Sequence, residues 1–177
     1  MTRARQVGLI VCIGLLAAGI GLWAGSSRLQ EAPPADDAVA QMFAQTYPNA
    51  DGKPQPMAQW KGRVLVVNFW ATWCPPCVEE MPDLQKIRDE YRARGVEIVG
   101  IGIDNEAKIR AFRDQYRLTL PLLVAGFEGS SLAQALGNKA GALPYTALVD
   151  RSGHVVQRKL GQIRPAELRA WLDAQLR

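Results

Sequence analysis

Residues 64–81 read VLVVNFWATWCPPCVEEM. The first part is a near-continuous apolar, β-branched and aromatic run, which predicts a strand buried on both faces. The last part favours a helix, so Cys74 and Cys77 lie at a strand-to-helix turn, at a spacing that allows a disulfide between them. Because a C-x-x-C pair can also be half of a zinc site, its surroundings must distinguish the two.

The position of this pair at the start of a helix predicts a reactive thiol. Unpaired N–H groups and aligned peptide dipoles at a helix N-terminus favour a negative charge. Pro75 and Pro76 fit a first helical turn and carry no N–H, so the first backbone donor beyond Cys74 that could reach its sulfur is that of Cys77. We expect Cys74 to be the exposed attacking thiol, with a lowered pKa, and Cys77 to be the buried resolving thiol.

The composition fits one globular domain with an appendage. The chain has 177 residues, 21% of them charged, and a formal net charge of +4. Many of the basic residues are arginines scattered over predicted solvated helix faces, which argues against a nucleic-acid surface. Cys12 lies in an apolar run and reads as a small hydrophobe. A zinc site would need more ligands than the cysteine pair and the single histidine, His154, so we expect no metal.

The N-terminus predicts a membrane anchor. Arg3 and Arg5 precede the nineteen uncharged residues 7–25, which are about long enough to span a bilayer as a helix. The positive flank stays in the cytoplasm, so the rest of the chain is exported. We favour an uncleaved signal anchor at 1–25 over a cleaved signal peptide. The proline-containing residues 26–38 follow as a flexible tether, and 39–177 form the globular domain.

Beyond residue 81 the sequence predicts alternating helices and strands. The helix that starts at Pro75 contains Pro82, which should kink it, and ends before Gly95. Residues 39–47 fit either a strand or a helix. The other predicted elements are a strand at 96–103, a helix capped by Asn105 with Ile109, Phe112 and Tyr116 facing inward, a strand at 120–124, a helix at 130–136 capped by Ser130, strands at 145–150 and 154–160, and a helix at 165–176.

The order of these elements predicts an α/β sandwich. A strand, helix and strand of these lengths form a right-handed parallel crossover, whereas the tight turn at 151–153 joins an antiparallel hairpin. The central sheet is therefore mixed, with helices on both faces. The cysteine pair lies at the carboxyl end of a strand, where open α/β sheets place their sites.

Several motifs together resemble the thioredoxin-fold proteins, and more narrowly their membrane-anchored TlpA/ResA/CcmG-like branch. They are NFWATWCPPC (68–77), EEMP (79–82), DGKP with WKGR (51–63) and LPYTALVDRSGHV (143–155). The resemblance covers about residues 48–176. It implies a thioredoxin-like three-layer sandwich with a TlpA-type insertion at 120–137, behind the N-terminal transmembrane helix.

The resemblance also implies a binding groove beside the cysteines. Pro144 would be a cis proline packed opposite them, leaving a groove where an incoming protein strand can pair. The alternative is an ordinary trans proline at the start of a strand. Leu143 would then tune which thiols or metals approach. Trp73, next to Cys74, would cover the thiol and meet partners, while Trp70 would fill the core.

One departure from thioredoxin itself concerns the proton. Thioredoxin has a buried aspartate in the strand before its cysteines, and the corresponding residue here is Asn68, which cannot take a proton. Glu80 lies three residues after Cys77 on the same helix face, and in similar anchored reductases a glutamate at this position lies close to the thiols. We hypothesise that Glu80 shuttles the proton that activates Cys77. The alternative is a solvated helix glutamate, as Glu79 is assumed to be.

The resemblance implies a membrane-tethered, periplasmic thiol-disulfide oxidoreductase of a bacterial inner membrane. It would act as a monomeric reductant of exported proteins, in cytochrome c maturation or metalloprotein assembly, using its Cys74–Cys77 disulfide without a cofactor. Its partners would be exported proteins with thiols or disulfides and a membrane thiol electron donor. Two alternatives remain: a thiol peroxidase of peroxiredoxin type, and a non-catalytic copper- or haem-handling protein with the two thiols as soft ligands.

Overall fold

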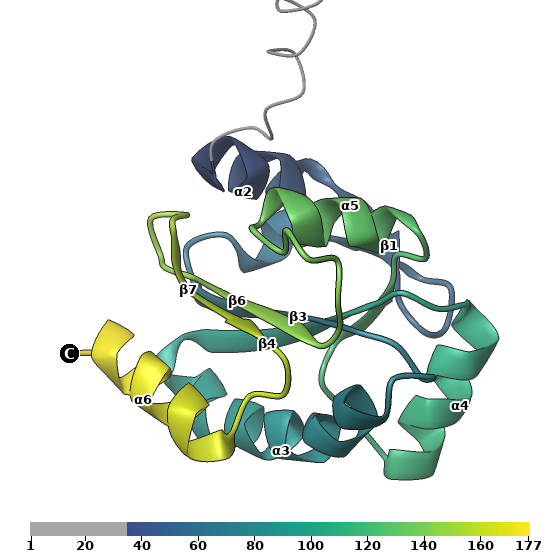
Figure 1. Ribbon diagram of the computed structural model, residues 1–177. Coiled ribbons are helices and arrows are strands. Elements are labelled where there is room, and N and C mark those ends of the chain that lie inside the picture. Colours follow the sequence, from purple (N-terminus) through teal and green to yellow (C-terminus); the bar gives the residue numbers. More distant parts are fainter. Residues whose placement is uncertain (1–34) are drawn as a thin grey trace, which may run out of the picture. The chain divides into compact units, whose positions relative to one another are not determined.

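The computed structural model describes residues 35–177, which form a mixed sheet between two layers of helices (Figure 1). The predicted anchor at 1–25 and most of the predicted tether lie outside this range. Within it, no helix is both long and apolar enough to cross a membrane. The elements are α2 (Ala35–Ala44), β1 (Thr46–Pro48), β2 (Pro54–Pro56), η2 (Met57–Trp60), β3 (Val64–Trp70), α3 (Pro75–Tyr91), η3 (Arg92–Arg94), β4 (Val96–Gly102), α4 (Glu106–Tyr116), β5 (Leu122–Val124), α5 (Glu128–Ala135), β6 (Tyr145–Val149), β7 (Val155–Leu160) and α6 (Pro165–Gln175).

The five-stranded sheet has the order β5-β4-β3-β6-β7, with β3 at its centre. The β3–β4 and β4–β5 pairs are parallel, whereas β3–β6 and β6–β7 are antiparallel. The predicted crossover, the predicted hairpin and the mixed sheet are therefore confirmed. β1 and β2 form a separate small antiparallel pair.

The alternation of side chains along β3 builds two hydrophobic cores. Val64, Val66 and Trp70 face one core, whereas Leu65 and Phe69 face the other. The first core lies under α3, α4 and α6, and the second lies under α2, η2 and α5 (Figure 1). Every residue of β3 is buried, which explains why its sequence lacks a polar face. The predicted three-layer sandwich is confirmed.

The helix that carries the cysteines begins at Pro75 as predicted, but the α-helix ends at Tyr91, a few residues before its predicted end near Arg94. Pro75 and Pro76 occupy its first turn, and the helix continues through Pro82 to Tyr91. A short 3-10 turn follows, and Gly95 ends it in the left-handed conformation, with φ of 86°. α4 has the predicted cap, because the Oδ1 atom of Asn105 accepts a hydrogen bond from the N–H of the third residue beyond it, at 3.0 Å.

Three local expectations are corrected. Residues 39–47 divide between α2 and β1, and α2 begins at Ala35, so residues 35–38 are helical rather than part of the tether. α5 begins at Glu128, so Ser130 lies inside the helix and does not cap it. Tyr116 is 41% exposed, because it ends α4 and stacks on the outer side of Phe112, at 4.6 Å between ring centroids.

Candidate active site

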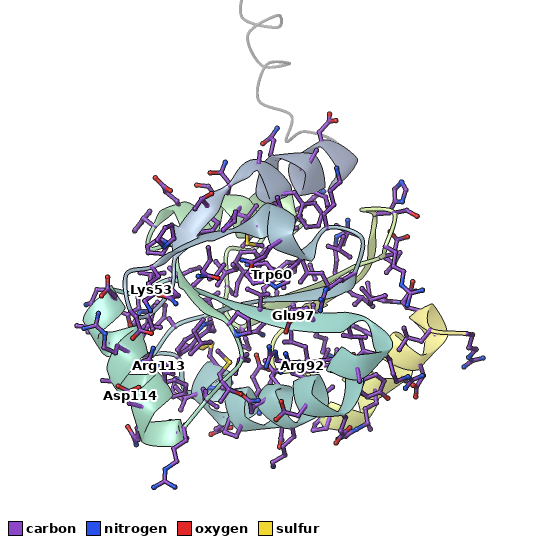
Figure 2. All side chains as sticks on the ribbon, turned by 180° about the vertical axis from the view of Figure 1, so that it is seen from behind. Lys53, Trp60, Arg92, Glu97, Arg113 and Asp114 are labelled. Carbon is purple, nitrogen blue, oxygen red and sulfur yellow. A yellow bond between two sulfur atoms is a disulfide. The ribbon has the colours of Figure 1, made fainter. Side chains whose placement is uncertain are left out.

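Cys74 and Cys77 form a disulfide at the carboxyl end of β3, with their Cα atoms 5.3 Å apart (Figure 2). Cys74 is the residue before the first turn of α3, and Cys77 lies within that turn. Cys74 was expected to be exposed, but it is only 5% exposed, because both residues pack into the core beneath α3. Cys77 is fully buried, so Cys74 is still the more exposed residue of the pair.

Pro144 lies at the same end of the sheet as the disulfide. The Leu143–Pro144 peptide bond is cis, as the resemblance implies. The next residue, Tyr145, pairs with Phe69 near the end of β3, which places the buried Pro144 beside the strand that leads to Cys74. Leu143 is partly buried and packs against both cores.

A hollow of about 440 Å³ opens next to this end of the sheet. Trp73 and Leu143, both predicted site residues, line one part of it, and Phe127 and Ile103 line another. Trp73 is 63% exposed and Phe127 is 91% exposed. Sequence reasoning missed Phe127, although an aromatic residue between Gly126 and Glu128, in the predicted insertion, is a signal that could have found it. Two exposed aromatic side chains beside a disulfide favour contact with another protein.

Glu80 is buried beneath the disulfide end of α3, with only 2% of its surface exposed. Burial raises its pKa to about 7, against the opposing effect of two hydrogen bonds. One comes from the N–H of Ile163 to Oε2, at 2.9 Å, and the other from Asn68 Nδ2 to Oε1, at 2.7 Å. The solvated-glutamate alternative is therefore wrong for Glu80, whereas Glu79 is exposed as assumed.

Asn68 links Glu80 to the central sheet. Its Nδ2 atom also donates to the Oγ1 atom of Thr146, at 3.0 Å, across the β3–β6 pair. Its Oδ1 atom is buried and has no hydrogen-bond partner among the described residues. The sequence identified Asn68 only as a residue that cannot take a proton. Its contact with Thr146, and that of Ile163 with Glu80, were missed because they depend on strand register and on a loop.

The arrangement suits thiol–disulfide exchange. A disulfide lies at a helix N-terminus, and Trp73, the residue before Cys74, lines a largely apolar hollow. A carboxyl group with a pKa near neutrality lies one helical turn beyond Cys77. Within residues 35–177, no three side chains of histidine, cysteine, aspartate or glutamate are grouped so as to hold a metal ion.

Comparisons with known proteins give the same picture. A family model described as Redoxin matches residues 34–174. The chain is 32% identical to the thiol-disulfide oxidoreductase ResA of Bacillus thuringiensis (strain Al Hakam) over 123 residues. This alignment covers 69% of each of the two chains. A crystal structure of a thiol:disulfide interchange protein of the thioredoxin family from Chlorobium tepidum TLS has a TM-score of 0.66 at 28% identity, over 75% of this chain and 93% of that one. Peroxiredoxin Q of Xanthomonas campestris has a TM-score of 0.64 at 21% identity, over 78% and 95% of the chains, which shows the fold alone.

Proposed function

The chain belongs to the Redoxin family and is a thiol-disulfide oxidoreductase of the ResA type, and on this premise we propose that it reduces exported proteins at the outer face of a bacterial inner membrane. The observation that carries the proposal is the Cys74–Cys77 disulfide at the first turn of α3, beside the hollow that Trp73 and Leu143 line. Exchange there needs no cofactor other than the two sulfurs.

The proposed reaction begins with the reduced protein. The Cys74 thiolate attacks one sulfur of a substrate disulfide, forms a mixed disulfide and releases the other substrate sulfur as a thiolate. The Cys77 thiolate then attacks the Cys74 sulfur, closes the Cys74–Cys77 disulfide and releases the second substrate thiolate. Two electrons pass to the substrate, whose two thiolates take up protons. A membrane thiol donor returns two electrons to the disulfide and completes the cycle.

Glu80 is the group that takes the proton of Cys77 in this proposal. A carboxyl group with a pKa of about 7 is present in both protonation states near neutral pH, so it can accept a proton and release it again. Its hydrogen bonds from Asn68 and Ile163 hold the carboxylate in one position on the buried side of α3.

The proposed substrate segment lies in the hollow beside the disulfide. Trp73 and Phe127 present apolar surface to it, and Leu143, the residue before the cis Pro144, forms another part of its wall. The side chains around a substrate cysteine would contact these residues while its sulfur is bonded to Cys74. In this proposal the substrates are exported proteins, such as apocytochrome c or a metalloprotein in assembly, because the predicted anchor places the domain outside the cytoplasm.

The membrane location is inferred from the N-terminal sequence. Residues 7–25 carry no charge and follow Arg3 and Arg5, which supports an anchor at 1–25 with the positive flank in the cytoplasm. Residues 26–34 would link it to a monomeric catalytic domain that begins with α2 at Ala35. In such an oxidising compartment the cysteine pair persists as a disulfide until a donor reduces it.

Trapping of the mixed disulfide tests this function. In the full chain with Cys77→Ser, a substrate bound to Cys74 cannot be released by the second thiol. We expect an exported protein to remain attached to this variant in membranes and to dissociate with dithiothreitol, and nothing to be attached when Cys74 is replaced as well. Catalytic consumption of peroxide by the unmodified protein, or stoichiometric copper on its reduced form without disulfide reductase activity, would contradict the proposal.

The direction of electron flow needs its own measurement. A difference of about 30 mV corresponds to about 1.4 kcal/mol for a two-electron couple. Equilibration of the protein with thiol–disulfide buffers gives its reduction potential. We expect a reducing potential, closer to that of thioredoxin than to that of a strong oxidase, and a potential in the range of strong oxidases would reverse the proposed direction.

A further inference from the structure

Five exposed cations gather at the end of the sheet opposite the disulfide. Lys61 and Arg63 precede β3, Arg92 and Arg94 precede β4, and Arg151 lies in the turn between β6 and β7. Because β3 and β4 are parallel, their amino ends meet at one edge of the sheet, while Cys74 follows the carboxyl end of β3. We call these five residues the basic pole.

Hydrogen bonds to backbone carbonyls join the segments of the basic pole, although its residues are far apart in the sequence. The N–H of Val64 donates to the carbonyl of Gly95 at 3.2 Å, which joins the segments before β3 and β4. Arg151 reaches the same place, since its Nη2 atom donates to the carbonyl of Arg94 at 3.5 Å. Arg92, labelled in Figure 2, belongs to the short turn between α3 and β4.

Carboxylates neutralise only part of this charge. Arg94 pairs with Asp173 at 3.2 Å, and Arg63 lies 3.9 Å from Glu97. Glu97 is buried and already pairs with Arg88, so it offers little to Arg63.

The other three cations of the basic pole have no such partner. Among residues 37–177, whose side chains the structure describes, no carboxylate lies at ion-pair distance from Lys61, Arg92 or Arg151. Asp150, the nearest acid along the chain to Arg151, accepts hydrogen bonds from the N–H groups of Ser152 and His154. The basic pole therefore has a surplus of positive charge.

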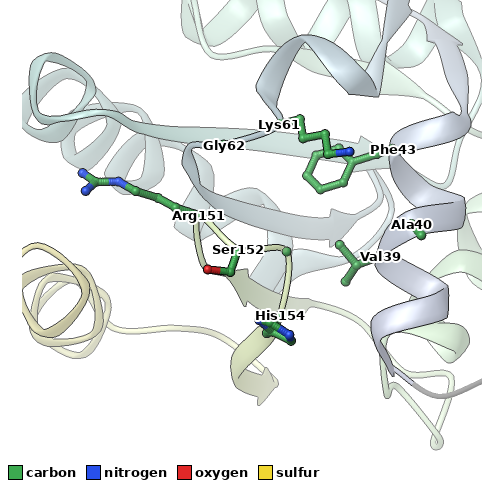
Figure 3. A pocket seen from close by; sticks show the side chains of 9 residues that line it. Val39, Ala40, Phe43, Lys61, Gly62, Arg151, Ser152 and His154 are labelled. Carbon is green, nitrogen blue, oxygen red and sulfur yellow. The ribbon is translucent and has the colours of Figure 1, made fainter.

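A pocket of about 270 Å³ adjoins the basic pole and has an apolar wall (Figure 3). Val39, Ala40 and Phe43 of α2 form that wall, and Lys61 with the turn at 151–154 forms the opposite one. Cationic and apolar side chains on facing walls suit the boundary between lipid headgroups and acyl chains.

The chain enters the described domain at this pocket. α2 begins at Ala35, one turn before Val39, and a Cβ atom placed on Gly153 would lie 3.9 Å from Val39. The 34 residues that precede Ala35, including the proposed anchor, are therefore attached next to the basic pole. An anchor within these residues would be joined to the domain at this face.

We propose that the basic pole is a membrane-docking surface that binds anionic phospholipid headgroups and keeps the disulfide end of the sheet turned away from the bilayer. We infer anionic lipid as the ligand because the basic pole has a surplus of positive charge and because the N-terminal segment joins the domain beside it. Each lysine or arginine near an anionic surface strengthens attraction by about fivefold, and only within about one Debye length of 8 Å. The inference rests on the membrane tether of the proposed function.

Lysine footprinting on the full chain in lipid nanodiscs tests the proposal. Acetylation of Lys61 is measured by mass spectrometry, with Lys86 of α3, whose side chain is 69% exposed, as the internal reference. Discs of phosphatidylcholine alone are compared with discs that also contain phosphatidylglycerol. We expect Lys61 to react several times more slowly than Lys86 only in the anionic discs, and high salt to abolish the difference.

A pair of charge-matched variants makes the test specific. Replacing Arg92 and Arg151 with glutamine keeps Lys61 as the reporter and should reduce the ratio of docked to undocked domain by about 25-fold, at fivefold per cation. The control replaces Lys139 and Arg164 with glutamine, two exposed cations near the disulfide end, and should leave the protection of Lys61 unchanged.

Several outcomes would overturn the docking surface. One is equal protection of Lys61 from acetylation in both kinds of disc. Another is an equal loss of that protection in the Arg92/Arg151 variant and in the Lys139/Arg164 control. A third is protection of Lys61 by inorganic phosphate without lipid, which would indicate a small-anion site. If the full chain does not stay bound to phosphatidylcholine discs, the membrane tether is refuted. The docking surface then stands only if the chain still binds to the anionic discs. Reaction of the Cys74–Cys77 pair with dithiothreitol reports separately on the oxidoreductase and should be the same in all variants.

Discussion

At the residue scale, the charge of Glu80 depends on a balance between burial and hydrogen bonding. Desolvation disfavours the carboxylate, and the two donors, Asn68 Nδ2 and the Ile163 N–H, favour it. Burial has the larger effect, so the pKa is raised to about 7. The sequence could place Glu80 on the same helix face as Cys77, because residues three apart are neighbours on a helix. It could not identify the donors, which come from β3 and from the loop before α6.

The raised pKa of Glu80 makes stability depend on pH. The folded state holds this proton more tightly than the unfolded chain, so the stabilisation is fully present below pH 4.5 and is lost as the pH rises to about 7. Relative to Glu80→Gln, the unmodified protein should lose up to about 3 kcal/mol over that interval. Urea unfolding of the oxidised proteins at a series of pH values measures this, with Glu79→Gln as the exposed control. Parallel pH profiles for the unmodified protein and Glu80→Gln would show that Glu80 has an ordinary pKa.

Removing the side-chain donor should shift the same titration. In the unmodified protein the hydrogen bond from Asn68 to Glu80 Oε1 favours the carboxylate. Asn68→Ala removes this bond, so the pKa of Glu80 should rise above about 7. The loss of a buried hydrogen bond to an ionisable group should also lower stability by about 1–3 kcal/mol. NMR titration of the Glu80 carboxyl carbon measures the pKa. Thr146→Val keeps the Asn68 donor and should shift the pKa less, and an equal shift in both variants would argue against a direct effect of Asn68.

At the element scale, segments with strong local signals could be predicted and segments with weak ones could not. β3 and β4 are fully buried runs, and Gly95 ends the helical segment between them, so their order and parallel pairing followed from the sequence. α5 starts earlier than its serine suggested because packing positions it. Gly129 lies so close to β4 and the residue after it that an added Cβ would lie 3.4 Å from Ile101 and 3.1 Å from Ile103. Tertiary contacts of this kind leave no pattern in a single sequence.

The cap of α4 allows a test of one local signal. Asn105 Oδ1 accepts from the N–H of Lys108 at 3.0 Å and satisfies one of the free amides at the start of the helix. Asn105→Ala should lower the free energy of unfolding by about 1 kcal/mol, whereas Asn105→Ser, which keeps an acceptor, should cost less. Urea denaturation of the oxidised proteins compares the three. If the serine variant is as unstable as the alanine variant, the side chain of Asn105 stabilises the protein through contacts other than this cap.

At the scale of the whole molecule, the two ends of the sheet differ in chemistry. The carboxyl end of β3 carries the disulfide and the hollow with Trp73 and Phe127, while the amino end carries the basic pole. The sequence predicted the first end, because its residues are consecutive around the cysteines. It did not predict the second, because Lys61, Arg92 and Arg151 are separated by tens of residues and were interpreted as scattered surface charge. The parallel pairing of β3 with β4 and the antiparallel pairing of β3 with β6 bring them together.

The hollow also joins distant parts of the chain, since Trp73 precedes α3 and Phe127 precedes α5. If a substrate protein lies there, Phe127→Ala should remove apolar contact with the substrate but leave the disulfide chemistry intact. In the Cys77→Ser background we expect about tenfold less trapped protein, the loss that about 1.4 kcal/mol of binding energy produces. Reaction of Cys74 with a small disulfide such as glutathione disulfide should stay the same. Tyr116→Ala, which shortens another exposed aromatic on α4 outside the hollow, is the matched control. Equal losses with both variants, or a slower reaction with the small disulfide, would place the substrate elsewhere.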